Sequence, residues 1–148
     1  MEITEVRIKL VNDPGDKLRG FATITIDDAL VIRDLKIIEG NRGLFVAMPS
    51  RKLQDRCPSC ACKNALRSRY CNDCGRRLRE RRGPADSSGR ERLYADIAHP
   101  IHQEGRELVQ TRVVSAYHVE LDASRKVGYV AQRFDDLDYD AYGEPPPD

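Results

Sequence analysis

Two short cysteine motifs constrain the fold of this 148-residue chain more than any other feature. Cys57 and Cys60 form one C-x-x-C motif, Cys71 and Cys74 form a second, and ten residues separate the two. Each motif presents two sulfur atoms from a tight turn, and a short hairpin can bring both pairs around one tetrahedral ion. Thiolates suit Zn²⁺, so we predict one zinc ion per chain. Four protein ligands leave no open coordination position, which indicates a structural ion.

All five cysteines lie between Cys57 and Cys74, whereas a disulfide framework is usually spread through a fold. We therefore expect a reduced, cytoplasmic protein. The fifth cysteine, Cys62, is interpreted as a spare thiol beside the site, with a ligand exchange or a redox switch as alternatives. The competing interpretation of the whole cluster is a dithiol redox pair. A redox pair needs only one C-x-x-C motif, so the presence of two matched motifs favours a metal site.

The segment around the motifs resembles a zinc ribbon. The residues that carry this resemblance are Cys57-Pro58, Asn64, Tyr70, Cys74-Gly75 and Leu78. Zinc ribbons often have glycine directly after the first cysteine pair, and Ala61 occupies that position here. The resemblance covers about twenty residues.

The first fifty residues show the alternation of half-buried β-strands. Val6 and Ile8 face one side while Arg7 and Lys9 face the other. Further strands are predicted at residues 21–26, 30–38 and 44–48, with turns at 12–16, 27–28 and 39–43. Because the turns are short, we expect an antiparallel meander. The continuous apolar run at 44–48 predicts a strand buried on both faces.

A helix is predicted from Gln103 to about Leu121, because Val109, Val113, Ala116 and Tyr117 share one face. Strand character returns at residues 93–98. The predicted fold class is α+β, a small antiparallel sheet with a C-terminal helix, plus an inserted zinc ribbon. The predicted divisions are a core of residues 1–52 and 92–124, an insert of residues 53–91 that ends in a flexible basic linker, and a C-terminal extension of residues 125–148 with a disordered acidic tail. A core this small is marginal alone, which favours dimerisation.

The formal net charge of +1 hides a strong asymmetry along the chain. Residues 1–50 hold 7 basic and 8 acidic side chains, and residues 93–148 hold 5 basic and 11 acidic ones. Residues 51–92 hold 13 basic and 5 acidic side chains, a net charge of +8. The basic block coincides with the predicted zinc ribbon, and such a block is typical of proteins that bind nucleic acid. The acidic tail either folds back on this basic block and competes with nucleic acid, or only aids solubility.

A metal-held hairpin that carries arginine can contact phosphates, because a guanidinium binds them in a bidentate manner. The alternative is a solvated basic linker. The candidate contacts in the insert are Arg67, Arg69, Arg76, Arg77, Arg79, Arg81 and Arg82.

The rest of the chain resembles the SpoVG family of bacterial septation proteins. The resemblance is carried by MEITEVRI at residues 1–8, GNRGLFVAMPS at 40–50 and DIAHPI at 96–101, with Arg106 and Ala116-Tyr117 in the helix. It implies a small sheet with a C-terminal helix, a homodimer, a link to cell division and sporulation, and binding of DNA or RNA. The family positions tied to nucleic acid correspond to Arg51, Lys52, Arg106 and Arg112. Family members join the two halves by a short loop, whereas this chain has the insert there.

Other functions find little support in the sequence. No nucleophile–base pair, glycine-rich phosphate loop, membrane segment or signal peptide is recognisable. Of the three histidines, His99, His102 and His118, His99 precedes Pro100 and is interpreted as structural, and His118 has no cysteine or acidic partner at ligand spacing. We therefore expect no enzyme and no small-molecule substrate. The predicted function is a cytoplasmic, homodimeric regulator that binds nucleic acid through the insert. A protein–protein adaptor and a zinc- or redox-responsive sensor are the alternatives, and the target and the choice of DNA or RNA stay open.

Overall fold

The computed structural model describes residues 1–80 and 82–132. The chain divides into two compact units, which we name the core unit (Met1–Pro49 and the chain from Ala98 on) and the insert unit (Ser50–Ile97). Residues 50–52 and 92–97, which the sequence placed with the core, group instead with the insert unit. Arg81 and the predicted acidic tail lie outside the described residues.

The core unit contains the predicted antiparallel meander. Strands β1 (Ile3–Leu10), β2 (Leu18–Ile26), β3 (Leu30–Gly40) and β4 (Gly43–Ala47) pair in the order β1-β2-β3-β4. Residues 27–29 form the turn between β2 and β3, and Asp27 and Asp28 have positive φ, 52° and 54°. The Ala29 N–H donates to the Ile26 carbonyl at 2.9 Å, so the two left-handed residues are the centre of a tight turn, and aspartate tolerates this conformation.

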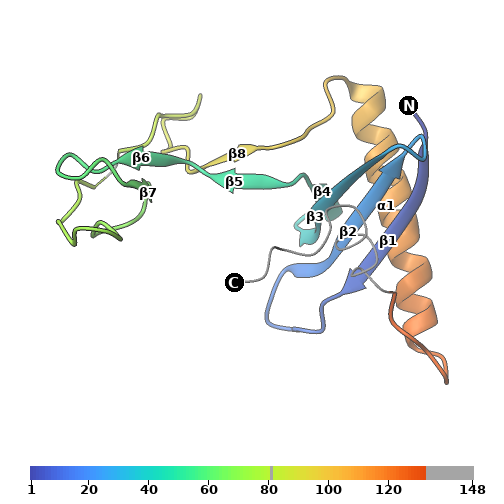
Figure 1. Cartoon of the computed structure of the whole chain (residues 1–148). Helices are drawn as coiled ribbons and strands as arrows, with labels where there is room; N and C mark the ends of the chain where they lie inside the picture. The colour runs from blue at the N-terminus through green and yellow to red at the C-terminus, as the bar shows by residue number, and fades with distance from the viewer. Residues whose placement is uncertain (81, 133–148) are drawn as a thin grey trace, which may run out of the picture. The chain divides into compact units, whose positions relative to one another are not determined.

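Helix α1 (Gln103–Ser124) packs against one face of this sheet (Figure 1). Val109, Val113 and Tyr117 are buried on the sheet-facing side of the helix, as predicted. They meet a layer of buried sheet side chains, among them Ile8, Ile24, Leu35 and Ile37. His102 caps the helix, because its Nδ1 accepts a hydrogen bond of 2.9 Å from the backbone N–H of Gly105. Within the described residues no helix combines the length and apolar character that a membrane crossing requires.

The prediction that residues 44–48 are buried on both faces was wrong. Strand β4 is an edge strand of the sheet, and Phe45 is 45% exposed. The Gln110 side chain of α1 occupies part of the open edge, since its Oε1 accepts from the Val46 N–H and its Nε2 donates to the Leu44 carbonyl, both at 2.9 Å. A continuous apolar run therefore marks an edge strand here, one that a helix side chain partly closes.

The insert unit is built from short antiparallel pairs. Strand β5 (Ser50–Lys52) pairs with β8 (Tyr94–Asp96), and β6 (Gln54–Arg56) pairs with β7 (Lys63–Ala65). The strand expected at residues 93–98 is thus shorter and pairs outside the core sheet.

The predicted flexible linker at residues 82–90 is a hydrogen-bonded hairpin. The Arg92 N–H donates to the Pro84 carbonyl and the Asp86 N–H to the Arg90 carbonyl, both at 2.7 Å. The Asp86 carboxylate accepts from the backbone of Ser88 and Arg90 at 2.9 Å. Glycine, serine and aspartate suit a tight turn as well as a flexible segment, so composition alone misjudged this stretch.

Candidate metal centre

The two cysteine motifs form matching turns in the insert unit. The Ala61 N–H donates to the Cys57 carbonyl at 2.9 Å, and the Gly75 N–H donates to the Cys71 carbonyl at 3.1 Å. In each turn a backbone N–H also points at the first sulfur, from Ser59 to Cys57 and from Asp73 to Cys71, both at 3.4 Å. The turns therefore surround the sulfur atoms with donors, an arrangement that stabilises thiolates.

Both turns end on a residue in the left-handed conformation. Ala61 has φ 63° and Gly75 has φ 77°. Glycine adopts this conformation without a steric cost, whereas alanine does so at a cost of roughly 1–2 kcal/mol. The position that zinc ribbons often fill with glycine is thus strained in the first turn.

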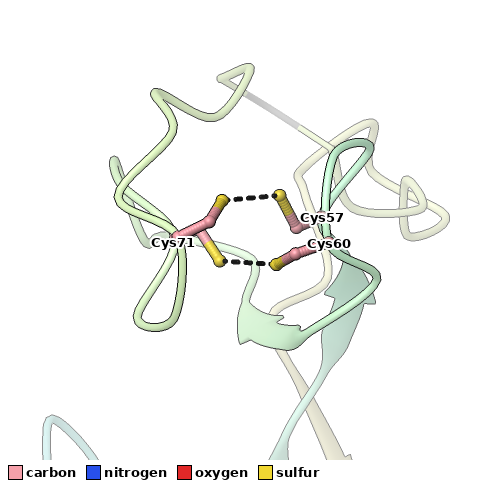
Figure 2. Close-up of side chains that lie close together, drawn as sticks. Cys57, Cys60 and Cys71 are labelled. Atoms are coloured by element: carbon pink, nitrogen blue, oxygen red, sulfur yellow. Dashed lines mark hydrogen bonds between the residues drawn. The ribbon is translucent and has the colours of Figure 1, made fainter.

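The four sulfur atoms of the motifs converge, as Figure 2 shows for Cys57, Cys60 and Cys71. The Sγ atoms of Cys57 and Cys74 lie 3.7 Å apart, those of Cys60 and Cys71 lie 3.5 Å apart, and all four lie within 4.8 Å of one another. A tetrahedral ion with metal–sulfur bonds of about 2.3 Å needs sulfur–sulfur separations of about 3.8 Å. The four cysteines can therefore hold one metal ion, and the donor set fits a tetrahedral thiolate site.

The buried side chain of Asn64, 1% exposed, links the two turns. Its Nδ2 donates to the Cys62 carbonyl at 3.1 Å and lies 3.5 Å from the Cys71 sulfur, while its Oδ1 accepts from the Asn72 N–H at 2.9 Å. This contact orients a ligand from outside the coordination sphere. The sequence singled out Asn64 only by its resemblance to zinc ribbons.

The sulfur environments separate the pKa values of the cysteines. The Cys74 N–H, the Asn64 amide and the Asp73 N–H lower the pKa of Cys71 to about 5. The Cys62 N–H lowers the pKa of Cys60, but desolvation and contacts with the Cys71 and Cys74 sulfurs outweigh it and raise the pKa to about 12. A cation replaces thiol protons, so metal binding is coupled to proton release.

Several predicted contact arginines surround a hollow in the insert unit. The hollow has a volume of about 680 Å³ and is lined by Asp55, Arg56, Pro58, Arg76, Arg77, Leu78, Arg79 and Arg82. Arg76 also donates to the Ser59 hydroxyl at 2.6 Å. Arg56 was not predicted as a contact residue, although its position directly before Cys57 was a usable signal. Arg67 and Arg69 are exposed outside this hollow.

Arg82 differs from the other arginines because its guanidinium is used inside the insert unit. It donates from Nε to the Asp55 carboxylate at 2.5 Å, from Nη1 to the Arg79 and Ser68 carbonyls at 2.5 and 3.1 Å, and from Nη2 to the Ala65 carbonyl at 2.9 Å. Its side chain is 11% exposed. Arg82 therefore joins β6, β7 and the segments that contain Ser68 and Arg79, and it has little capacity left for a ligand.

The predicted contacts outside the cysteine region are divided between the two units. Arg51 and Lys52 lie exposed on β5 in the insert unit, whereas Arg106 and Arg112 lie on α1 in the core unit. The Arg112 guanidinium donates to the Ile3 carbonyl at 3.1 Å and so holds β1 against the helix. Arg106 and Arg112 are six residues apart, about 240° around the helix axis.

Sequence comparison places this fold in a known family. The SpoVG family matches the chain over residues 1–119. The chain belongs to the SpoVG family. Similar relatives, each named "Putative septation protein SpoVG", come from Finegoldia magna (36% identical over 127 residues, 86% of this chain and 83% of the relative) and Agathobacter rectalis (34% over 122 residues, 82% and 98%). A relative of that name from Bdellovibrio bacteriovorus is 35% identical over 121 residues, 82% of this chain and 77% of its own. The SpoVG match describes no metal site, so the candidate centre rests on the sulfur geometry.

Proposed function

We propose that this SpoVG-family protein is a regulator that binds nucleic acid through its insert unit, with one structural Zn²⁺ at the four cysteines. The observation that carries the proposal is the hollow of about 680 Å³, which is lined by arginines that precede the first cysteine turn and follow the second. Arginine offers a rigid, bidentate fork to phosphate oxygens. A metal-held scaffold presents several such forks at low cost in conformational entropy.

Zinc is the metal that the ligand set favours. Four thiolates at tetrahedral spacing suit Zn²⁺ and leave no position for a substrate or an activated water. The buried cluster around the centre consists of Cys57, Cys71 and Leu78, with Cys62 packed against it. So small an apolar cluster cannot hold the unit alone, and the metal supplies the missing stability.

Bound zinc leaves the insert basic. Residues 51–92 carry 13 basic and 5 acidic side chains, and four thiolates with one Zn²⁺ add a charge of −2, so the net charge falls from +8 to +6. Neutralising roughly four phosphates gives a log–log dependence of binding on salt with a slope of about −3.6 for duplex DNA and about −2.8 for a single strand.

The core unit serves as a dimerisation platform. Large apolar side chains stay exposed on it, among them Phe45 on the edge strand (45%) and Ile101 (87%) before α1. The names of the relatives refer to septation, and regulation of that process is the role we assign to this cytoplasmic protein. Light scattering tests the assembly: a mass of twice 16.8 kDa supports the dimer, and a mass of 16.8 kDa contradicts it.

Elemental analysis and a binding titration test the main proposal together. We expect one zinc per chain and salt-dependent binding of labelled oligonucleotides, both lost in a Cys57→Ser, Cys74→Ser double variant. Zinc without any oligonucleotide binding rejects the nucleic-acid function and leaves the adaptor as the function to test. Stable folding of the insert unit without metal rejects the structural role of zinc.

Cys62 favours a second candidate function, a redox-responsive sensor. Its half-buried side chain packs against the cluster that contains Cys57 and Cys71. Hydrogen peroxide can oxidise the Cys62 thiol and one ligand thiolate to a disulfide, with one proton taken from solvent and two water molecules formed, and the ion then loses a ligand. Peroxide should release zinc more slowly from a Cys62→Ser variant than from the parent protein if Cys62 is a redox sensor. Equal rates of zinc release from the variant and the parent exclude this role.

A further inference from the structure

An exposed aromatic ring stands beside the basic hollow of the insert unit. Tyr70 directly precedes the ligand Cys71, yet its side chain is 59% exposed. Tyr70 pairs with Arg77 in an antiparallel bridge. On either side of this pair, the Cys71 N–H donates to the Arg76 carbonyl at 2.8 Å and the Leu78 N–H donates to the Arg69 carbonyl at 2.7 Å. The backbone under the ring is thus fixed by the second turn of the metal centre.

The direction of the Tyr70 ring follows from this pairing. Cys71 and Leu78, the neighbours of Tyr70 and Arg77 along the chain, are 4% and 6% exposed and form the inner cluster. Successive side chains of an extended segment point to opposite faces, and directly opposed residues share a face. Tyr70 and Arg77 therefore project together, away from the metal cluster. The ring adds nothing to the core of the insert unit.

Arg77 connects the ring to the phosphate-binding surface. It lines the hollow of about 680 Å³ with Arg76 and Arg79, and it stands directly opposite Tyr70. A strand whose phosphates contact these arginines can therefore present a base to the exposed ring of Tyr70.

A second exposed tyrosine repeats the arrangement in the same unit. Tyr94 on β8 is 53% exposed and pairs with Lys52 on β5. Tyr94 and Lys52 line a small hollow that also includes Arg67. Both exposed tyrosines of the insert unit thus have a cationic residue as their cross-strand partner.

We infer that the insert unit binds single-stranded nucleic acid, with unpaired bases stacked on Tyr70 and Tyr94 and the backbone held by the arginines. This inference rests on the proposed function. Aromatic rings combined with a basic groove are the physical requirement for binding unpaired bases, since every base has a face that can stack. In a duplex these faces are covered by neighbouring base pairs, so the two rings gain nothing from it. Because stacking tolerates any base, little sequence preference is expected from these two contacts.

Fluorescence anisotropy with three matched probes tests the inference on the full-length zinc protein. The probes are a single strand of roughly 12 nucleotides, within the range of known site sizes, an abasic strand of the same length, and a duplex of that length. The abasic strand retains the phosphates and lacks the bases. RNA and DNA versions of the single strand establish which sugar is preferred.

We expect the single strand to bind more tightly than the abasic strand and the duplex. Tyr70→Ala should weaken single-strand binding by about 5- to 150-fold, the loss of one stacked base, and Tyr94→Ala should act in the same direction. The Tyr70→Phe variant keeps the ring and should bind the single strand as the parent does. Abasic-strand binding should change by no more than about twofold, because the phosphate contacts are untouched.

The outcomes separate the two proposals. If no probe binds, the proposed function itself fails. If the single strand and the abasic strand bind equally, or if Tyr70→Ala weakens both alike, phosphate binding stands and the stacking inference is overturned. One zinc per chain in each tyrosine variant shows that an observed loss does not come from unfolding of the insert unit.

Discussion

The amide nitrogen of Asn64 lies 3.5 Å from the sulfur of Cys71, and the Asn64 side chain is buried between the two cysteine turns. The same side chain accepts from the Asn72 N–H at 2.9 Å and donates to the Cys62 carbonyl at 3.1 Å. One neutral side chain therefore supports the second turn, the end of the first turn and one ligand. It couples the metal centre to the backbone that presents the arginines.

Replacing Asn64 with alanine should weaken zinc binding by about 10- to 100-fold, the usual effect of losing a group that orients a ligand. Competition with a zinc chelator measures the affinity. Asn72→Ala is the matched control, because Asn72 contributes its backbone N–H to the Asn64 contact and its own side chain is exposed. Equal affinities of the two variants would show that Asn64 does not support the centre.

Replacing Ala61 with glycine should stabilise the insert unit by up to about 1 kcal/mol. The substitution relieves the left-handed strain at φ 63°, and the greater entropy of glycine in the unfolded chain offsets part of the gain. Chemical denaturation of the zinc protein measures the change. Ala65→Gly, in strand β7, is the control and should destabilise the unit. A loss of stability in Ala61→Gly would contradict the account of the first turn.

Replacing Arg82 with lysine should destabilise the insert unit by about 2–3 kcal/mol, because several partly buried carbonyls lose their donors and the Asp55 carboxylate loses the Nε–H donor. Hydrogen exchange of the β6 and β7 amides reports the loss locally. Arg79→Lys is the control, since the Arg79 side chain is exposed. Similar exchange in both variants would mean that Arg82 is not a structural residue.

Removing the metal should unfold the insert unit and leave the core unit folded. The core unit has its own buried layer of sheet and helix side chains, whereas the insert cluster comprises Cys57, Cys71 and Leu78. Because thiolate ligands compete with protons, acidification should release the metal in the same way. Amide exchange with and without a chelator distinguishes the units, and protection of β6 and β7 that survives metal removal would contradict this prediction.

Replacing Gln110 with alanine should destabilise the core unit by about 1–2 kcal/mol, because the Val46 N–H and the Leu44 carbonyl lose their partners. Thr111→Ala, an exposed position on the same helix, is the control. Thermal unfolding of the core unit measures both. Identical midpoints would show that water replaces the Gln110 amide at no cost.

Periodic and spaced patterns in the sequence predicted most of the fold and the cysteine cluster. Alternation around Ile8 and the helical spacing of Val109, Val113 and Tyr117 report burial directly, and two C-x-x-C motifs imply convergent sulfurs. The edge position of β4 could not be predicted, because Leu44 and Phe45 are apolar whether a strand is central or at an edge. The internal role of Arg82 also escaped detection, since a paired arginine and a solvated one look alike in a sequence.

Charge removal in the hollow tests the central claim most directly. An Arg76→Gln, Arg77→Gln, Arg79→Gln variant is compared with a Lys9→Gln, Lys36→Gln, Arg42→Gln variant, which loses the same charge from exposed positions of the core unit. Zinc content is checked in both, and anisotropy is measured across salt with the nucleic acid that the parent binds best. The insert variant should bind about 10-fold or more weakly, and the magnitude of its log–log salt slope should be smaller by about 2–3. The core variant should bind as the parent does. Equal binding by the two variants would contradict the assignment of nucleic-acid contact to the insert unit.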